Sequence, residues 1–306
     1  MGQTAFVFPG QGVQTIGMGK DFYGNFPEAK AVFEKASDAA GMDIAKLCFE
    51  ENEMINVTEY TQTAILTTEL AILEAVKQKI KPDVLAGLSL GEYAALAAAG
   101  AVSLETVIPL IRKRGKIMQE AVPEGKGCMA VVIGLQSDLI EQECSLEAGS
   151  VQIANYNSPL QSVLSGETEA VHRVMKKLKE QGAKLVSELS VSVPSHCQLM
   201  AEAGERLGAE LTGIDFEPLQ IPYIPNCTAR CCRDKKMIPE LLIRQLSSPV
   251  YWYQSVQEMI RNGVDTIIEI GPGNTLKKLI KKTDSSIRAY SCSNIQEYDA
   301  LCEIQF

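Results

Sequence analysis

A GxSxG motif occupies residues 87–91, with Ser89 at its centre. The preceding run from Val84 to Leu88 is short and apolar, as in a buried strand, and a helical pattern runs from Glu92 to Ala99. Glycines let a strand turn abruptly into a helix, because larger side chains would clash at that corner. Such a turn exposes the serine hydroxyl and aims the N–H groups of the helix N-terminus at developing negative charge. We therefore predict that Ser89 is an enzymatic nucleophile, with an ordinary tight turn as the alternative.

A serine nucleophile needs a general base at neutral pH, and the chain contains two histidines. His172 stands beside Arg173 and two lysines in a helical pattern, a polar setting that favours a surface position. His196 follows Pro194, where the middle part of the chain returns to the pattern of its first part. Because junctions between domains commonly line clefts, we predict that His196 is the base, with a structural histidine as the alternative.

Arg114 lies in a helical pattern that runs from Leu104 to Ala121. The apolar residues of this helix form one stripe, and Arg114 falls in the middle of that stripe. A buried arginine is costly unless an anion pairs with it. That anion is either a buried acidic side chain or the carboxylate of a substrate, which a guanidinium can hold by two parallel hydrogen bonds. The helix alone favours neither.

Gln11 belongs to a Pro-Gly-Gln-Gly loop at residues 9–12, directly after an apolar strand pattern from Thr4 to Phe8. Open α/β sheets bind ligands at the carboxyl ends of their strands. The backbone N–H of Gln11 could therefore approach the Ser89 turn, although a plain turn also explains the tetrapeptide.

Strand and helix patterns alternate through the first part of the chain. Helical periodicity runs from Asn25 to Ala40 and from Thr61 to Lys79, which predicts a parallel sheet covered by helices on both faces. The same alternation resumes near the end, with a strand from Thr266 to Ile270 and a helix from Thr275 to Lys282. These patterns predict an α/β core.

The middle of the chain has a different order of elements. Its patterns predict βαββαβ, which is the ferredoxin-like unit. The segments are strand Gly127–Gly134, helix Ser137–Ala148, strand Val151–Asn155, strand Gln161–Ser165, helix Ala170–Gln181 and strand Lys184–Val193. We therefore predict that residues 125–194 form a subdomain inserted into a core made of residues 1–124 and 195–306.

The composition excludes several classes of protein. Of 306 residues, 46% are hydrophobic and 22% are charged, as in an ordinary globular protein. The net charge of −9 argues against a dedicated nucleic-acid binder, which needs a basic face. Nine cysteines form no CxxC pair, which predicts no metal site and a reducing compartment. Without a cationic-then-apolar leader or a long apolar run, we expect a cytoplasmic monomer with no membrane partner.

Three groups of basic residues stand out against the acidic net charge. Each is either a solvated surface or a docking site for an acidic partner or for phosphates. The first basic cluster is Lys176, Lys177, Lys179 and Lys184, the second is Arg230, Arg233, Lys235 and Lys236, and the third is Lys277, Lys278, Lys281 and Lys282.

Taken in order along the chain, these motifs resemble those of the bacterial malonyl-CoA:acyl-carrier-protein transacylase family. The resemblance covers roughly residues 3 to 290 and implies an α/β-hydrolase-like parallel-sheet core with an inserted ferredoxin-like subdomain. The matching segments are Phe8–Gly12, Gly87–Tyr93, Arg114–Lys116, Ala154–Pro159, Pro194–Cys197, Arg244–Leu246 with Pro249-Val250, and Glu269–Gly273.

The resemblance implies a role for each reacting group. Ser89 would carry the acyl group as an ester, and His196 would act first as general base and then as general acid. The backbone N–H groups of Gln11 and Leu90 would form the oxyanion hole. Gln245 would orient His196 through its main-chain carbonyl, in the place of the usual triad acid.

The resemblance also assigns residues to the substrate. Arg114 would pair with the free carboxylate of malonyl, and Asn155 would line the pocket. One position departs from the family pattern, since Leu88 stands where family members commonly have histidine. That histidine is not the general base, so the departure concerns the pocket polarity and the choice of substrate rather than catalysis.

The implied reaction moves malonyl from malonyl-CoA, the substrate, to the phosphopantetheine thiol of acyl carrier protein, the partner, with no cofactor and no metal. Carrier proteins of fatty-acid synthesis and of polyketide pathways both fit. Carrier proteins are acidic, as this chain is, so docking requires a local basic patch, which we expect in the first or second basic cluster. Two other classes stay open: a serine esterase or thioesterase, which passes the acyl group to water, and a binding protein without activity.

Overall fold

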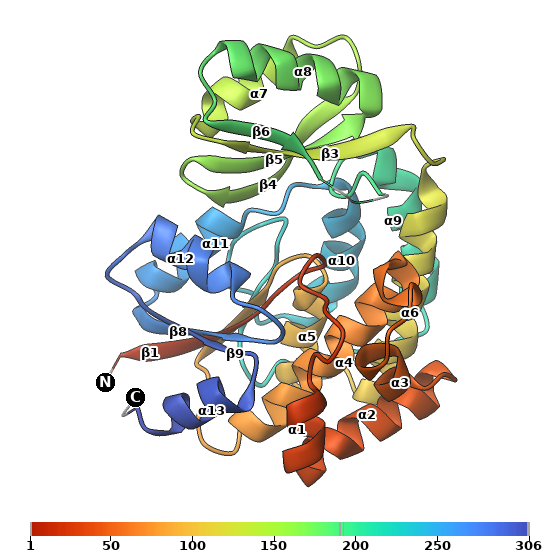
Figure 1. The fold of residues 1–306 in the computed structure, drawn as a ribbon, viewed down its shortest axis with the longest axis vertical. Helices are drawn as coiled ribbons and strands as arrows, with labels where there is room; N and C mark the ends of the chain where they lie inside the picture. Colours follow the sequence, from red (N-terminus) through yellow and green to blue (C-terminus); the bar gives the residue numbers. More distant parts are fainter. Residues whose placement is uncertain (1, 190, 192, 305–306) are drawn as a thin grey trace.

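The computed structural model describes residues 2–189, 191 and 193–304, whose strands form two sheets (Figure 1). The larger sheet is parallel, with the strand order β7-β2-β1-β8-β9. In its central strand, Phe6 is paired with Leu85 on one side and with Ile268 on the other. The strands are β1 (Gln3–Phe8), β2 (Val84–Gly87), β7 (Tyr223–Ile224), β8 (Val264–Ile270) and β9 (Arg288–Cys292).

Alternate residues of β1 face opposite sides of this sheet, and both sides are buried. Phe6 and Phe8 pack into the larger hydrophobic core, whereas Ala5 and Val7 pack into a smaller one. The smaller core is formed against α11 (Trp252–Arg261) and α12 (Thr275–Thr283). The larger core takes residues from α1 (Lys20–Asn25), α2 (Pro27–Ala40), α3 (Ile44–Phe49), α4 (Thr58–Val76), α5 (Gly91–Ala98), α6 (Leu104–Ala121), α9 (Ala201–Leu211), α10 (Ile238–Ser247) and α13 (Ile295–Cys302).

The smaller sheet is antiparallel, with the strand order β4-β5-β3-β6. Its helices pack on the face that points away from the parallel core (Figure 1). The elements are β3 (Gly127–Ile133), α7 (Ser137–Ser145), β4 (Val151–Ser158), β5 (Gln161–Glu167), α8 (Thr168–Glu180) and β6 (Leu185–Glu188). This order and pairing are those of the ferredoxin-like unit, so the predicted fold class is confirmed.

Strand β4 joins the antiparallel sheet to the parallel core. The backbone N–H of Tyr156 donates to the carbonyl of Val250 (3.0 Å), and the N–H of Val250 donates to the carbonyl of Ala154 (2.8 Å). The ring of Tyr156 also stacks on that of Tyr251, with 5.1 Å between their centroids. These contacts hold the inner face of the antiparallel sheet against the core.

The helix predicted over Asn25–Ala40 is divided in the structure. Helix α1 ends at Asn25, Phe26 is extended (φ −123°, ψ 114°), and α2 begins at Pro27. A proline disfavours the helical conformation in the residue before it, so Pro27 separates the two helices. Short 3-10 helices lie at Met54–Asn56, Gln198–Met200 and Lys235–Met237.

The strand predicted over Lys184–Val193 is shorter in the structure, because β6 ends at Glu188. Just beyond β6, the N–H of Leu189 donates to the carbonyl of Met129 (2.8 Å), and the N–H of Val191 donates to the carbonyl of Leu189 (2.8 Å). Ser190 and Ser192, which the prediction included, lie outside the described residues. Among the residues that are described, no helix has both the length and the apolar character needed to cross a membrane.

Candidate active site

Ser89 occupies a sharp turn between β2 and α5. Its backbone has φ 55°, in the left-handed region that residues with a side chain rarely adopt. The glycines on either side are required by close approach: a Cβ at Gly87 would lie 1.9 Å from the carbonyl carbon of Gly91, and one at Gly91 would lie 2.1 Å from the carbonyl oxygen of Phe8. The turn therefore has the strained geometry of a nucleophile elbow, as the motif predicts.

The imidazole of His196 connects this turn to helix α10. Its Nε2 lies 2.7 Å from Ser89 Oγ, and its Nδ1 lies 2.7 Å from the carbonyl oxygen of Gln245. A carbonyl oxygen only accepts, so Nδ1 carries the proton and Nε2 is free to accept one from Ser89. Burial, followed by the nearby charge of Arg114, lowers the pKa of His196 to about 4, which keeps the ring neutral at pH 7.

Arg114 is fully buried and points at the same serine. Its Nη1 donates to Gln62 Oε1 (2.7 Å), and its Nη2 donates to Gln245 Oε1 (2.9 Å) and to Ser89 Oγ (3.2 Å). All three acceptors are neutral, and the guanidinium forms no ion pair with a carboxylate of the described residues. Its Nε likewise has no hydrogen-bond partner within that part of the chain. The site thus contains a buried cation whose charge no neighbouring anion within ion-pair distance neutralises.

Two backbone N–H groups beside Ser89 are available to a ligand. The N–H of Ser89 itself donates to Asn226 Oδ1 (2.6 Å). By contrast, the N–H groups of Gln11 and Leu90 donate to no acceptor in the described part of the chain. Both residues border the cavity that contains Ser89, so each N–H is a candidate donor to an oxyanion.

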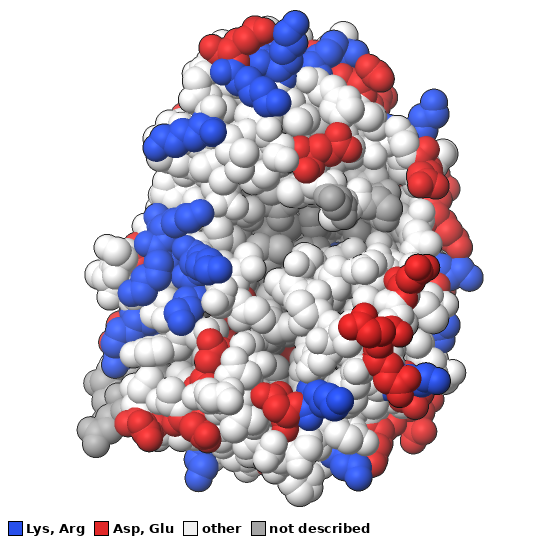
Figure 2. Space-filling view, viewed as in Figure 1, with Lys and Arg blue, Asp and Glu red and all other residues white. Residues whose placement is uncertain are grey.

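These groups open into a cavity of about 450 Å³ between the two sheets. Figure 2 shows the surface hollowed there, between the antiparallel unit and the parallel core. Asn155 and Asn157 reach the cavity from β4, and the Oδ1 atom of Asn157 is buried without a partner among the described residues. Most other lining residues from the antiparallel unit are apolar: Met129, Val131, Val163, Leu189 and Val191.

Comparison with known proteins agrees with this geometry. Residues 5–303 match the family described as "Acyl transferase domain". The malonyl CoA-acyl carrier protein transacylase of Bacillus subtilis (strain 168) is 42% identical, over 96% of this chain and 94% of that protein. The chain belongs to the malonyl-CoA:acyl-carrier-protein transacylase family. It is therefore an acyltransferase.

Other members of the transacylase family are similarly close to this chain. The protein of the same name from Escherichia coli (strain K12) is 40% identical, over 99% of this chain and 100% of that protein. The crystal structure of an acyl carrier protein S-malonyltransferase from Vibrio cholerae has a TM-score of 0.95 at 39% identity, and covers 98% of this chain and 99% of its own. A malonyl-transacylase solved with a type II PKS acyl-carrier protein has a TM-score of 0.96 at 40% identity, with the same coverage.

Leu88 is where this transacylase departs from the family pattern quoted above. Its half-buried side chain borders the cavity and packs against the smaller hydrophobic core. The wall of the cavity next to Ser89 is therefore apolar at the position where a histidine would make it polar.

Three polar residues of the site were missed by the sequence analysis. They are Gln62, which holds the guanidinium of Arg114 beside the predicted Gln245, and Glu92 and Asn226, which hold the residues around Ser89. Gln62 lies between Thr61 and Thr63 at the start of α4, where nothing in the sequence distinguishes it, and only the structure shows that it is buried. Glu92 and Asn226 gave no signal either, because their partners lie more than a hundred residues away in the chain.

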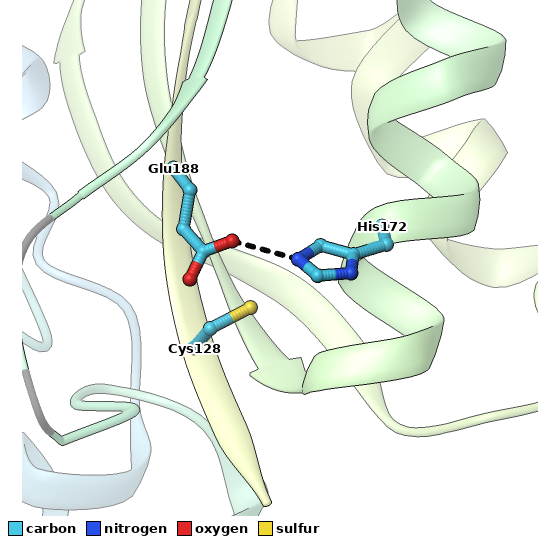
Figure 3. Close-up of side chains that lie close together, drawn as sticks. All are labelled: Cys128, His172 and Glu188. Carbon is cyan, nitrogen blue, oxygen red and sulfur yellow. Dashed lines mark hydrogen bonds and ion pairs between the residues drawn. The ribbon is translucent and has the colours of Figure 1, made fainter. Parts of the chain in front are cut away.

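One group outside the cavity has the side chains of a metal site. The ligand atoms of Cys128, His172 and Glu188 all lie within 4.8 Å of one another (Figure 3). His172 is exposed, as predicted, and its Nε2 already pairs with Glu188 Oε2 (2.7 Å). Cys128 faces α7 and α8, on the opposite side of the antiparallel sheet from the cavity. No residue of the Ser89 site belongs to this group.

Proposed function

We propose that this acyltransferase moves malonyl from malonyl-CoA to the phosphopantetheine thiol of an acyl carrier protein through an ester on Ser89. The observation that carries the proposal is the buried guanidinium of Arg114, which lies 3.2 Å from the Ser89 hydroxyl and forms no ion pair with a described carboxylate. An acyl group with a free carboxylate supplies the missing anion, and malonyl is such a group. The names of the relatives, which are malonyl transacylases, support the same substrate.

In the first half of the reaction, Ser89 Oγ attacks the thioester carbonyl carbon while His196 Nε2 takes the hydroxyl proton. The former carbonyl oxygen becomes an oxyanion, which the N–H groups of Gln11 and Leu90 stabilise by about 3 to 4 kcal/mol each. The carbon–sulfur bond then breaks, and His196 returns the proton to the departing CoA sulfur. Malonyl remains as an ester on Ser89.

The second half reverses these steps with a different thiol. His196 takes the proton of the pantetheine thiol, whose sulfur attacks the ester carbonyl. The carbon–oxygen bond breaks, the proton passes back to Ser89, and malonyl leaves as a thioester of the carrier protein. Since one thioester is exchanged for another, the reaction needs no external energy source, and this mechanism needs no cofactor or metal.

The carbonyl of Gln245 takes the place that a carboxylate has in a serine–histidine–aspartate triad. It holds the Nδ1–H of His196 and so fixes which nitrogen accepts the serine proton. This carbonyl holds the imidazole without adding a negative charge to the site.

The antiparallel sheet supplies the other wall of the cavity. We keep the proposed division into residues 125–194 and a core of residues 1–124 and 195–306, which places the cavity between the two units. The pantetheine arm is a chain with two amide groups, and the side-chain amides of Asn155 and Asn157 are complementary to them.

Docking of the carrier protein fits the third basic cluster better than the two clusters expected from the sequence. Helix α12, which carries the third cluster, also lines the cavity through Thr275 and Leu279, and basic residues gather beside the hollow in Figure 2. Lys278, Lys281 and Lys282 are exposed and form no ion pair among the described residues. The other two clusters are partly neutralised, since acidic residues pair with Lys177, Arg230 and Lys235. We therefore assign docking to the surface of α12.

Incubation with malonyl-CoA tests the proposed function. A stable adduct of malonyl mass on Ser89, discharged on addition of holo carrier protein, is the expected result. Rapid hydrolysis without carrier protein would instead indicate an esterase, and the absence of any adduct would indicate a binding protein. Ser89→Ala is the control that places the adduct on the serine.

A further inference from the structure

Glu92 is a buried carboxylate next to the reacting groups but not among them. It lies in the first turn of α5 and is fully buried. Its Oε2 accepts two hydrogen bonds, from the backbone N–H of Asn226 (3.0 Å) and from Gln245 Nε2 (2.8 Å). Among the described residues its side chain makes no hydrogen bond to Ser89 Oγ or to His196, so its hydrogen bonds act on the reacting groups through these two partners.

The first partner, Gln245, forms hydrogen bonds to Ser89, Arg114 and His196. Its Nε2 donates to the carbonyl of Ser89 (2.9 Å), and its Oε1 accepts from Arg114 (2.9 Å). Its own main-chain carbonyl accepts from His196. The two ends of a side-chain amide differ, because the nitrogen only donates and the oxygen only accepts. An acceptor at Glu92 therefore fixes the amide with its nitrogen towards Ser89 and its oxygen towards Arg114.

The second partner, Asn226, holds the strained turn. Its Oδ1 accepts from the N–H of Ser89 (2.6 Å), and its Nδ2 donates to the carbonyl of Gly87 (2.5 Å). The left-handed backbone of Ser89 is costly and persists only where surrounding contacts determine it. The bond from the Asn226 N–H to Glu92 keeps this side chain in place.

We propose that Glu92 is a positioning residue that holds Ser89 through Asn226 and aims Arg114 through Gln245, by accepting both hydrogen bonds at one buried oxygen. The proposal depends on the length of the Glu92 side chain, which brings one acceptor oxygen to both donors, and not on the charge of that side chain. Both partners are neutral donors, and an amide oxygen at the same place accepts from them as well. The part that concerns Arg114 and malonyl rests on the proposed function, whereas the part that concerns Ser89 does not.

Two substitutions at Glu92 separate the effect of side-chain length from the effect of charge. Glu92→Gln keeps the length and an acceptor oxygen but removes the charge, whereas Glu92→Asp keeps the charge and is one methylene too short to reach both donors. A buried donor left without an acceptor weakens the site, so Glu92→Asp is expected to slow the labelling of Ser89 by a small fluorophosphonate by about 10- to 100-fold. Glu92→Gln is expected to stay within about threefold of the parent protein.

Selectivity supplies the second readout. The ratio of acylation rates with malonyl-CoA and acetyl-CoA should fall in Glu92→Asp and remain in Glu92→Gln, since only the former lets Gln245 and Arg114 shift. Glu69→Gln is the matched control for the change of a buried carboxyl group to an amide. Glu69 is also fully buried, and neither of its oxygens has a partner among the described residues. The thermal unfolding of each variant is measured alongside its rates, so that a loss of stability is distinguished from a change at the site.

The opposite order, with Glu92→Gln impaired and Glu92→Asp near the parent, would overturn the proposal in favour of a role for the charge. Labelling and selectivity unchanged in both variants would overturn it as well. If labelling follows the expected order while the parent protein takes no malonyl, the proposed function fails and the role of Glu92 stands. If the parent takes malonyl and the order is absent, the role of Glu92 alone fails.

Discussion

The two walls of the cavity are built on opposite principles. On the wall from the parallel core, Ser89, His196 and Arg114 are each held by hydrogen bonds to buried polar groups. On the wall from the antiparallel sheet, the lining is apolar apart from a few amides, among them Asn155. Buried polar groups that are held by several hydrogen bonds are rigid, whereas apolar walls exclude water and tolerate change. In the proposed reaction, the core wall thus fixes the atoms that react, and the sheet wall shapes the space for the substrate.

The largest effect is expected on the core wall, at the nucleophile. Ser89→Ala should lower the rate of malonyl transfer by about four orders of magnitude or more, because no ester can form. Mass spectrometry after incubation with malonyl-CoA should show the adduct in the parent and none in the variant. A variant that still carries malonyl would place the nucleophile elsewhere and break the comparison.

Arg114→Ala should have the next largest effect. Loss of the partner of a charged group lowers kcat/KM for malonyl-CoA by about 100-fold or more and leaves acetyl-CoA relatively better used. Lys116→Ala, an exposed position on the same helix, is the control and should change neither rate. If Arg114→Ala keeps its preference for malonyl over acetyl, another residue binds the carboxylate.

The dependence on pH sharpens the description of the core wall. Burial lowers the pKa of His196 to about 4, so acylation should be level above pH 6 and should fall as the pH drops towards 4. The unfolded chain takes up this proton first, near pH 6.5, so the native state loses about 3 kcal/mol of stability between pH 6.5 and pH 4. Denaturant unfolding at each pH measures this loss of stability, and the contribution of His196 to the loss should be absent in His196→Gln. His172→Gln, a change at an exposed site away from the cavity, is the control for acylation and should leave its rate at pH 7 unaltered.

A smaller effect is expected on the sheet wall. Asn155→Ala should raise the KM for malonyl-CoA by about 3- to 10-fold through a lost hydrogen bond to the pantetheine arm. Labelling of Ser89 by a small fluorophosphonate should be unchanged, because that reagent has no arm. Gln142→Ala on α7, which is exposed on the far side of the same unit, is the control. Slower labelling in Asn155→Ala would show that the sheet wall also positions the reacting groups.

The smallest effect is expected outside the cavity, on α12. Lys278→Glu combined with Lys282→Glu should raise the KM for carrier protein by about fivefold and leave acylation by malonyl-CoA unchanged. The same two reversals at Lys176 and Lys179 should have no effect. The reverse result would return docking to the first basic cluster.

Much of the fold could be predicted because its causes are local. The glycines around Ser89 are required by backbone contacts within the turn itself, apart from the close approach to Phe8. The stripe that buries Arg114 follows from helical periodicity, and α6 spans the predicted range, Leu104–Ala121. The ferredoxin-like order of elements could be predicted because each of its strands and helices is a short segment with its own hydrophobic pattern. The break at Phe26 was also local, since Pro27 causes it, but it was overlooked.

The residues alone did not predict the site, which became clear first from the family resemblance and then from the fold. The residues alone left Arg114 equally suited to an internal ion pair, and the structure instead surrounds its guanidinium with neutral acceptors. The main-chain carbonyl of Gln245 came from the resemblance and not from the residues themselves, because every residue has such a carbonyl. Its position depends on where α10 ends relative to His196.

By itself, then, the sequence determined which turn can present a nucleophile, which helix buries a cation and which elements alternate, since periodicity and steric clash act between near neighbours. Only the tertiary structure decided that His196 meets Ser89 across 107 residues of chain, and that Glu92 meets Gln245 across 153. Such contacts depend on how two sheets and their helices pack, and a hydrogen bond of 2.7 or 2.8 Å has no counterpart in the composition or spacing of either segment.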